Sequence, residues 1–256
     1  MAEKREKVLV VIQLSGGNDY LNCIVPYENG HYKDARPNIK ITDDQVIPLD
    51  KGYGLNPGMN QIKDLYHQGK VAIIHGIGYP VPNRSHFRSM DIWHTAEPAT
   101  VGSKGWLGQA IAQLDPTGSN VVTAVNFANG LPRALAAPNV PVASVGDLVN
   151  YGLLSGVAGV LQRNMALNAF SRMYTPLIGN HSVMEYLGQT GLDAMRGADI
   201  LKEAPKRYVS NVEYPENPFA KSMKAVAQVH LADLGTRIFY TQYGSCLLYT
   251  STSPRD

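Results

Sequence analysis

The stretch KVLVVIQLSGGNDYLN, residues 7–22, decides the fold. It opens with a short, largely apolar run, which ends at the pair Gly16 and Gly17. A run of this length, bounded by a turn, is typical of a strand buried on both faces of a parallel sheet. A second run, KVAIIHG at residues 70–76, has the same character. We therefore predict that both runs are strands of one sheet.

Helical patterns separate the predicted strands. Between Pro57 and Gly69, apolar residues recur at three- and four-residue spacing, and Gly69 is a stop signal. Further helices are expected at 85–96, at 105–114 and from Pro218, and further strands at 120–127 and 236–242. The alternation of strands and helices predicts an α/β fold with a doubly wound sheet.

The pattern changes after residue 144, where strand signals vanish and apolar residues recur at helical spacing. We expect a helical insertion or cap in this part of the chain. The predicted organisation is the N-terminal half of the α/β domain at 1–144, the insertion at 145–215, and a return helix and strand at 216–245.

The composition excludes several classes of protein. The 256 residues carry a net charge of only +2, which does not suggest a nucleic-acid partner. No apolar run is long enough to span a bilayer. Two cysteines cannot build a disulfide scaffold or a four-thiolate metal site. A nucleotide-binding module is disfavoured, because Gly16-Gly17 lacks the spacing of a phosphate loop.

The last eleven residues, CLLYTSTSPRD at 246–256, resemble the translation of a transposase sequencing adapter at every position except Thr252. We expect these residues to be an artefact that replaces the natural sequence after about Ser245. Sequencing the source DNA across codon 245 tests this expectation, which fails if the same codons stand in the genome.

Two polar sites follow the first two predicted strands. Asp19 comes just after the first strand, and ligands of open α/β sheets bind beyond the carboxyl ends of strands. It is either a metal ligand or catalytic carboxylate, or a helix cap. Ser85 stands where a helix begins, so it is either an N-cap or a nucleophile near the positive end of the helix dipole. Arg84 and Arg88 either hold an oxyanion or are solvated.

Histidines near these sites are less informative. His86 follows Ser85 directly, and adjacent side chains on a helix do not face each other, so the two are not in themselves a catalytic dyad. His94 either packs the helix on the sheet or takes part in chemistry. His75 ends the second predicted strand, where a satisfied core imidazole is the favoured interpretation.

Several segments in order resemble the bacterial domain-of-unknown-function family 1501. They are VVIQLSGGNDYLNCIVPY, RPNIKI, GLNPGM, GKVAIIHGIGYPVPNRSHFRSMDIWHTA and GWLG, within a resemblance that covers about residues 7–245. Members are similar to the alkaline phosphatase and sulfatase superfamily. The resemblance implies a mostly parallel sheet sandwiched by helices, with a metal site at the strand ends. Many members carry a twin-arginine export signal, which is not seen here, so the localisation stays open between cytoplasm and export.

The resemblance also implies roles for particular residues. Asp19 matches the first metal ligand, and Ser85 the Ser, Thr or Cys nucleophile. His86 and Arg84 belong to the same motif, as a catalytic and a substrate-binding candidate. Asn18, directly before Asp19, and Asn22, three residues after it, are further substrate-binding candidates. The metal would be Zn, Mn or Ca. Family members carry further Asp and His ligands downstream of the segment that ends at Gly244, so this chain alone is expected to bind metal poorly and to be inactive.

Two functions remain open. The first is a metal-dependent hydrolase of phosphate or sulfate esters, acting on a small-molecule or polymer substrate, in which Ser85 attacks and Asp19 holds metal. The alternative is a non-catalytic binding or scaffold protein on the same fold, because one fold hosts many functions. Neither the ester nor the oligomeric state follows from the sequence.

Overall fold

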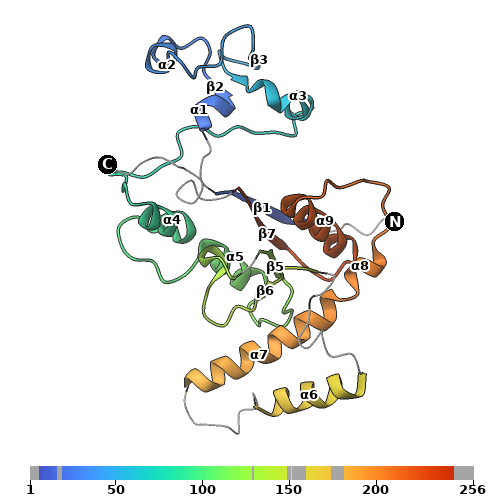
Figure 1. The fold of residues 1–256 in the computed structure, drawn as a ribbon. Coiled ribbons are helices and arrows are strands. Elements are labelled where there is room, and N and C mark those ends of the chain that lie inside the picture. Colours follow the sequence, from blue (N-terminus) through green and yellow to red (C-terminus); the bar gives the residue numbers. More distant parts are fainter. Residues whose placement is uncertain are drawn as a thin grey trace, which may run out of the picture. The chain divides into compact units, whose positions relative to one another are not determined.

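The computed structural model describes residues 6–15, 19–128, 130–148, 151, 160–173 and 182–244 (Figure 1). The chain forms two compact units. The larger unit comprises Met1–Gln13 and Val81–Tyr243, and the smaller comprises Leu14–Pro80 and Gly244–Asp256. Asn18 and the adapter-like segment 246–256 lie outside the described residues. The predicted boundaries of the helical insertion are not tested by this division and stay a prediction.

The larger unit is built on a four-stranded sheet in the order β1-β7-β5-β6. Its strands are β1 (Leu9–Leu14), β5 (Ala124–Phe127), β6 (Ala143–Ser144) and β7 (Ile238–Tyr243). β5 pairs in parallel with both β6 and β7. Beside β7, the Leu9 N–H donates to the Arg237 carbonyl at 2.9 Å, where both strands begin. The prediction of an α/β fold with a mostly parallel sheet is confirmed at this level.

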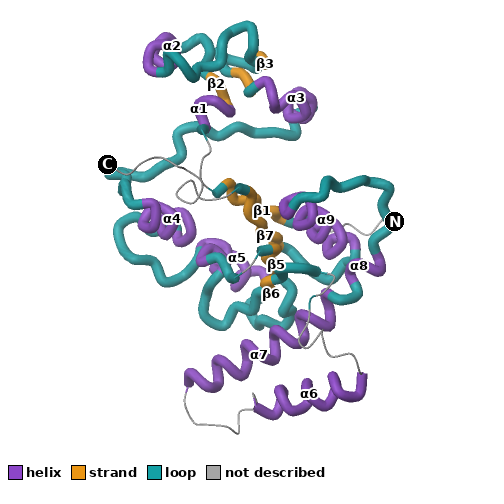
Figure 2. The backbone as a smooth tube through the Cα atoms, viewed as in Figure 1, coloured by secondary structure: helices purple, strands orange, loops and turns teal. Residues whose placement is uncertain are grey.

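Helices cover both faces of this sheet. The covering helices are α9 (Pro218–Leu231) on one face and α5 (Trp106–Leu114) on the other. The unit also contains α4 (His86–Thr95), α6 (Val160–Met173), α7 (Ser182–Leu201), α8 (Ala204–Arg207) and a 3-10 turn, η2 (Arg133–Leu135) (Figure 2). On one face Phe239 and Val125 pack with Val229 of α9. On the other, Ile238 packs with Leu107 of α5. Alternate strand residues therefore feed two separate cores, as the strand period of two requires.

Two helix starts in this unit were predicted from their caps. The Asn217 side chain accepts a hydrogen bond from the Ala220 N–H at 2.8 Å, with Pro218 at the first helical position of α9. Ser85 precedes α4 in the same way. Both predictions are confirmed. No helix among the described residues is long and apolar enough to cross a membrane.

The predicted strand at 70–76 is wrong. Lys70–Gly76 forms no regular structure, and the Ile74 side chain is 70% exposed. β1 is a strand but not a doubly buried one, because it lies at the edge of the sheet, where Ile12 is 41% exposed. An apolar, β-branched run favours a strand only where a neighbouring strand and a covering layer exist to receive it.

The smaller unit contains a three-stranded antiparallel sheet in the order β2-β4-β3. Its elements are α1 (Tyr20–Cys23), β2 (Ile24–Val25), α2 (Gly30–Ala35), β3 (Ile47–Pro48), β4 (Gly54–Leu55), η1 (Pro57–Met59) and α3 (Asn60–His67). Val25, Tyr32 and Val46 form its core. Gly54 has no room for a side chain, since a Cβ there would lie 2.5 Å from a methyl of Val46.

Candidate functional site

Ser85 caps α4 and remains accessible. Its Oγ accepts a hydrogen bond from the Arg88 N–H at 3.4 Å, which is long for such a bond. The Ser85 N–H donates to the Asn83 side chain at 2.8 Å, which fixes the backbone just before the helix. The Ser85 side chain is exposed. The cap interpretation is therefore confirmed, and the weak cap bond leaves the hydroxyl available for other chemistry.

The two neighbours of Ser85 are also exposed. Arg84 precedes the cap, and His86 is the first residue of α4. Adjacent positions on a helix point about 100° apart, so His86 is not oriented toward the Ser85 hydroxyl by the helix itself. The start of α4 thus presents a hydroxyl, an imidazole and a guanidinium at one exposed end.

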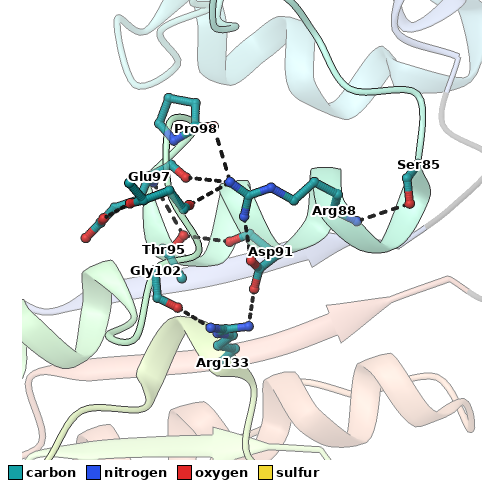
Figure 3. Close-up of polar contacts among 9 residues, drawn as sticks. Ser85, Arg88, Asp91, Thr95, Glu97, Pro98, Gly102 and Arg133 are labelled. Carbon is teal, nitrogen blue, oxygen red and sulfur yellow. Dashed lines mark hydrogen bonds and ion pairs between the residues drawn. The ribbon is translucent and has the colours of Figure 1, made fainter.

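Arg88 is neither solvated nor free to hold an oxyanion. Its guanidinium donates to the Asp91 carboxylate at 2.7 Å, one turn along α4 (Figure 3). Its other terminal nitrogen donates to the carbonyl oxygens of Glu97 at 3.2 Å, Pro98 at 3.2 Å and Thr100 at 2.6 Å. Arg88 therefore ties α4 to the loop that follows it.

Asp91 pairs with a second arginine as well as with Arg88. Its carboxylate also forms an ion pair with Arg133 of η2, which in turn donates to the Gly102 carbonyl. The Asp91 backbone carbonyl accepts from the Thr95 hydroxyl at 2.8 Å. Only 14% of the Asp91 side chain is exposed, so both arginines depend on one poorly hydrated carboxylate.

Replacing Asp91 with alanine should lower the free energy of unfolding by about 2 kcal/mol, because two guanidinium groups lose their carboxylate partner and keep, among the described residues, only backbone carbonyls. The exposure of Arg133 keeps the loss below that of a fully buried pair. Urea unfolding measures it, and Asp199→Ala, at an exposed position of α7, is the control. Equal losses of unfolding free energy in the two variants would show that the ion pairs of Asp91 do not stabilise the protein.

Asp19 lies in the smaller unit and is paired. It occupies the N-cap position of α1 without a side-chain cap bond. Its Oδ2 lies 2.5 Å from Nη1 of Arg36, which follows α2. The hydrogen bond from Arg36 lowers the pKa of Asp19 below its ordinary value. The carboxylate is therefore ionised at neutral pH and is 41% exposed.

Asn22 is held by the same small unit. Its Nδ2 donates to the Ile39 carbonyl at 2.8 Å, and its Oδ1 accepts from the Tyr32 hydroxyl at 2.7 Å. Tyr32 accepts in turn from the Ile41 N–H at 2.8 Å. Both polar ends of the Asn22 side chain thus join α1 to the 39–41 segment. Its role in substrate binding stays a prediction, as does that of Asn18.

His75 belongs to an aromatic cluster and does not end a strand. The imidazole Nδ1 lies 2.5 Å from the Tyr20 hydroxyl, and its ring lies 4.6 Å from that of Tyr53, centroid to centroid. All three residues belong to the smaller unit. The prediction of a satisfied core imidazole is wrong as to the core: His75 has hydrogen-bonding and ring partners, but its side chain is exposed, because residues 70–76 do not form a buried strand.

The described residues do not fit a divalent metal by themselves. Within them, no group of three or more His, Cys, Asp or Glu side chains gathers. The one predicted ligand, Asp19, already carries the Arg36 guanidinium. A zinc site needs three or four such ligands. The predicted site residues thus fall into an exposed group at the start of α4 and a paired carboxylate in the smaller unit.

Two features of the larger unit were not predicted from the sequence. A cleft of about 1060 Å³ lies where β5 and β7 end and α9 begins, with Phe127, Lys221 and Gln242 in its wall. Gln13 of β1 contacts both His94 of α4 and Tyr240 of β7. The cleft lies beyond the carboxyl ends of two strands, which is where open α/β sheets bind their ligands. The predicted strands at 120–127 and 236–242 therefore indicate its position.

Comparison of the chain with protein-family models, with curated proteins and with solved structures gives no match. The resemblance to the family therefore stays a prediction. The function is inferred mainly from the residues at the start of α4.

Proposed function

We propose that the full-length protein is a metal-dependent hydrolase of phosphate or sulfate esters on an alkaline phosphatase-like fold. The observation that carries the proposal is the accessible Ser85 hydroxyl at the start of α4, which among the described residues accepts a long cap hydrogen bond of 3.4 Å. The family resemblance supports the same residue as the nucleophile.

The start of a helix suits this chemistry. Its free N–H groups and the positive end of its dipole favour an anionic group. Ser85 Oγ would attack the phosphorus or sulfur atom, and the ester bond would break with its electrons on the leaving alkoxide, which would take up the proton released by Ser85 and leave as the alcohol. Water would then hydrolyse the ester on Ser85. Arg84, exposed beside Ser85, would bind the charged oxygens.

The divalent ion is proposed on the family resemblance alone. Family members carry downstream Asp and His segments that supply further ligands, and the described residues contribute at most Asp19. The two chemical steps above are therefore assigned to Ser85 and Arg84 without the ion.

Replacing Asp19 with asparagine should reduce the metal bound by the full-length protein, because the carboxylate is the one predicted ligand in this part of the chain. Elemental analysis after dialysis against Zn, Mn or Ca measures the metal content. Asp44→Asn, at an exposed loop position of the same unit, is the control. Equal metal content in the Asp19→Asn variant and the wild type would remove Asp19 from the site.

Turnover of aryl phosphate and aryl sulfate by the full-length protein, with each metal added in turn, tests the proposed function. The faster substrate identifies the ester class. Retained binding of a phosphate- or sulfate-bearing polymer without turnover of either ester would instead support the binding protein.

A further inference from the structure

An amide side chain of the sheet contacts the inner side of α4. Gln13 lies on β1, and its Oε1 accepts a hydrogen bond from the Tyr240 hydroxyl of β7. The same oxygen lies 2.8 Å from Nε2 of His94, near the end of α4. Gln13 therefore links two neighbouring strands and the helix that begins just after Ser85.

We propose that Gln13 is a positioning residue, whose amide oxygen holds His94 as its Nε2–H tautomer and so fixes α4, with Ser85 at its start, on β1 and β7. The role of Ser85 in this statement rests on the proposed function. The anchor itself rests only on contacts within the larger unit.

The tautomer follows from the chemistry of the shared acceptor. An amide oxygen has lone pairs and no proton, so each group that bonds to it must donate. Tyr240 donates its O–H, and His94 must then donate from Nε2. A neutral imidazole carries one N–H, which leaves Nδ1 of His94 without a proton.

The surroundings keep His94 neutral. Burial lowers the pKa of His94 below its ordinary value; Asp91 on α4 opposes this shift, and Arg133 of η2 adds to it. Burial raises the pKa of Tyr240 to about 12, so its hydroxyl keeps its proton at any physiological pH. Gln13 thus receives two neutral donors, and the anchor carries no net charge.

An anchor of this kind matters for a nucleophile on a helix end. α4 is also held by Arg88 and Asp91, but those contacts lead to loops and to η2. The Gln13–His94 bond leads directly to the sheet. Loss of the acceptor would remove the hydrogen bond of the partly buried His94 Nε2–H to the sheet, which favours movement of the helix away from the strand.

NMR of ¹⁵N-labelled protein tests the anchor. The ring nitrogen shifts of His94 should report the Nε2–H tautomer in the wild type. Gln13→Glu places a carboxylate against the same nitrogen and should move the His94 titration midpoint upward by about one pH unit. Gln109→Glu, on the exposed side of α5, should leave it unchanged. An Nδ1–H tautomer, or equal midpoints in Gln13→Glu and the wild type, overturns the proposal.

Positioning is tested separately from catalysis. Gln13→Met removes the acceptor at similar volume, and amide exchange in α4 should speed up by about tenfold, while Gln13→Glu, which keeps an acceptor, restores protection. Unchanged exchange in Gln13→Met overturns the positioning role. If the full-length wild type turns over esters, Gln13→Met should lower kcat with little change in KM. If it turns over none, the proposed function fails, and the tautomer and exchange results still decide the anchor.

Discussion

Replacing Ser85 with alanine is expected to reduce turnover of aryl phosphate or sulfate by the full-length protein by on the order of 10⁴-fold or more, the loss typical of a removed nucleophile. The same change removes the cap of α4, which costs about 1 kcal/mol of stability. Steady-state rates measure the first effect, and urea unfolding the second.

Two further variants separate the nucleophile from the cap. Asparagine caps helices as well as serine does but cannot attack an ester, so Ser85→Asn should be stable and inactive. Threonine keeps both the hydroxyl and a cap, so Ser85→Thr should retain stability and part of the rate. Full activity in Ser85→Asn would show that Ser85 serves only to cap α4.

Phe239→Ala is expected to be the most destabilising single change, lowering the free energy of unfolding by about 3–5 kcal/mol. Phe239 on β7 is fully buried, and its ring stacks on Phe127 with centroids 6.4 Å apart. It also lies edge-on to His230 of α9. Truncation would therefore leave a cavity between the centre of the sheet and a covering helix.

Urea unfolding of Phe239→Ala measures this loss, and Phe87→Ala is the matched control. Phe87 lies on α4 and is 85% exposed, so its truncation should change stability by less than about 0.5 kcal/mol. A loss below about 1 kcal/mol in Phe239→Ala would mean that the centre of the larger unit does not lie around β5 and β7.

The helix starts were predictable from the sequence because their signals are local. Asn217 and Ser85 accept hydrogen bonds from N–H groups three residues away, so a short window contains each cap and its partner. The strands at β5 and β7 were predicted for a related reason. Each lies in a short strand-like run, and each has partners on both sides in the sheet.

The strand predicted at 70–76 shows the limit of such patterns. Its composition is as favourable as that of β7, but pairing depends on a neighbour that no local window contains. Hydrogen bonds to a neighbouring strand decide whether an apolar run becomes a strand. The same reasoning explains why β1 was expected to be buried on both faces and instead lies at an edge.

The candidate site was predictable in position but not in its contacts. Ser85 was identified because it caps a helix, whereas the commitment of Arg88 to backbone carbonyls depends on how the 97–100 loop folds back. Arg36 reaches Asp19 across 17 residues, and Gln13 meets Tyr240 across 227. Long-range pairs of single polar side chains leave no periodic signal in the sequence.

We propose that Ser85 carries the transferred group of an ester hydrolase. Mass spectrometry of the full-length protein, quenched in acid during turnover of aryl phosphate or aryl sulfate, tests it most directly. We expect a phosphoryl or sulfuryl adduct on the peptide that contains Ser85, and no adduct in Ser85→Asn. Turnover with no adduct on that peptide, or with an adduct on another residue, would contradict it.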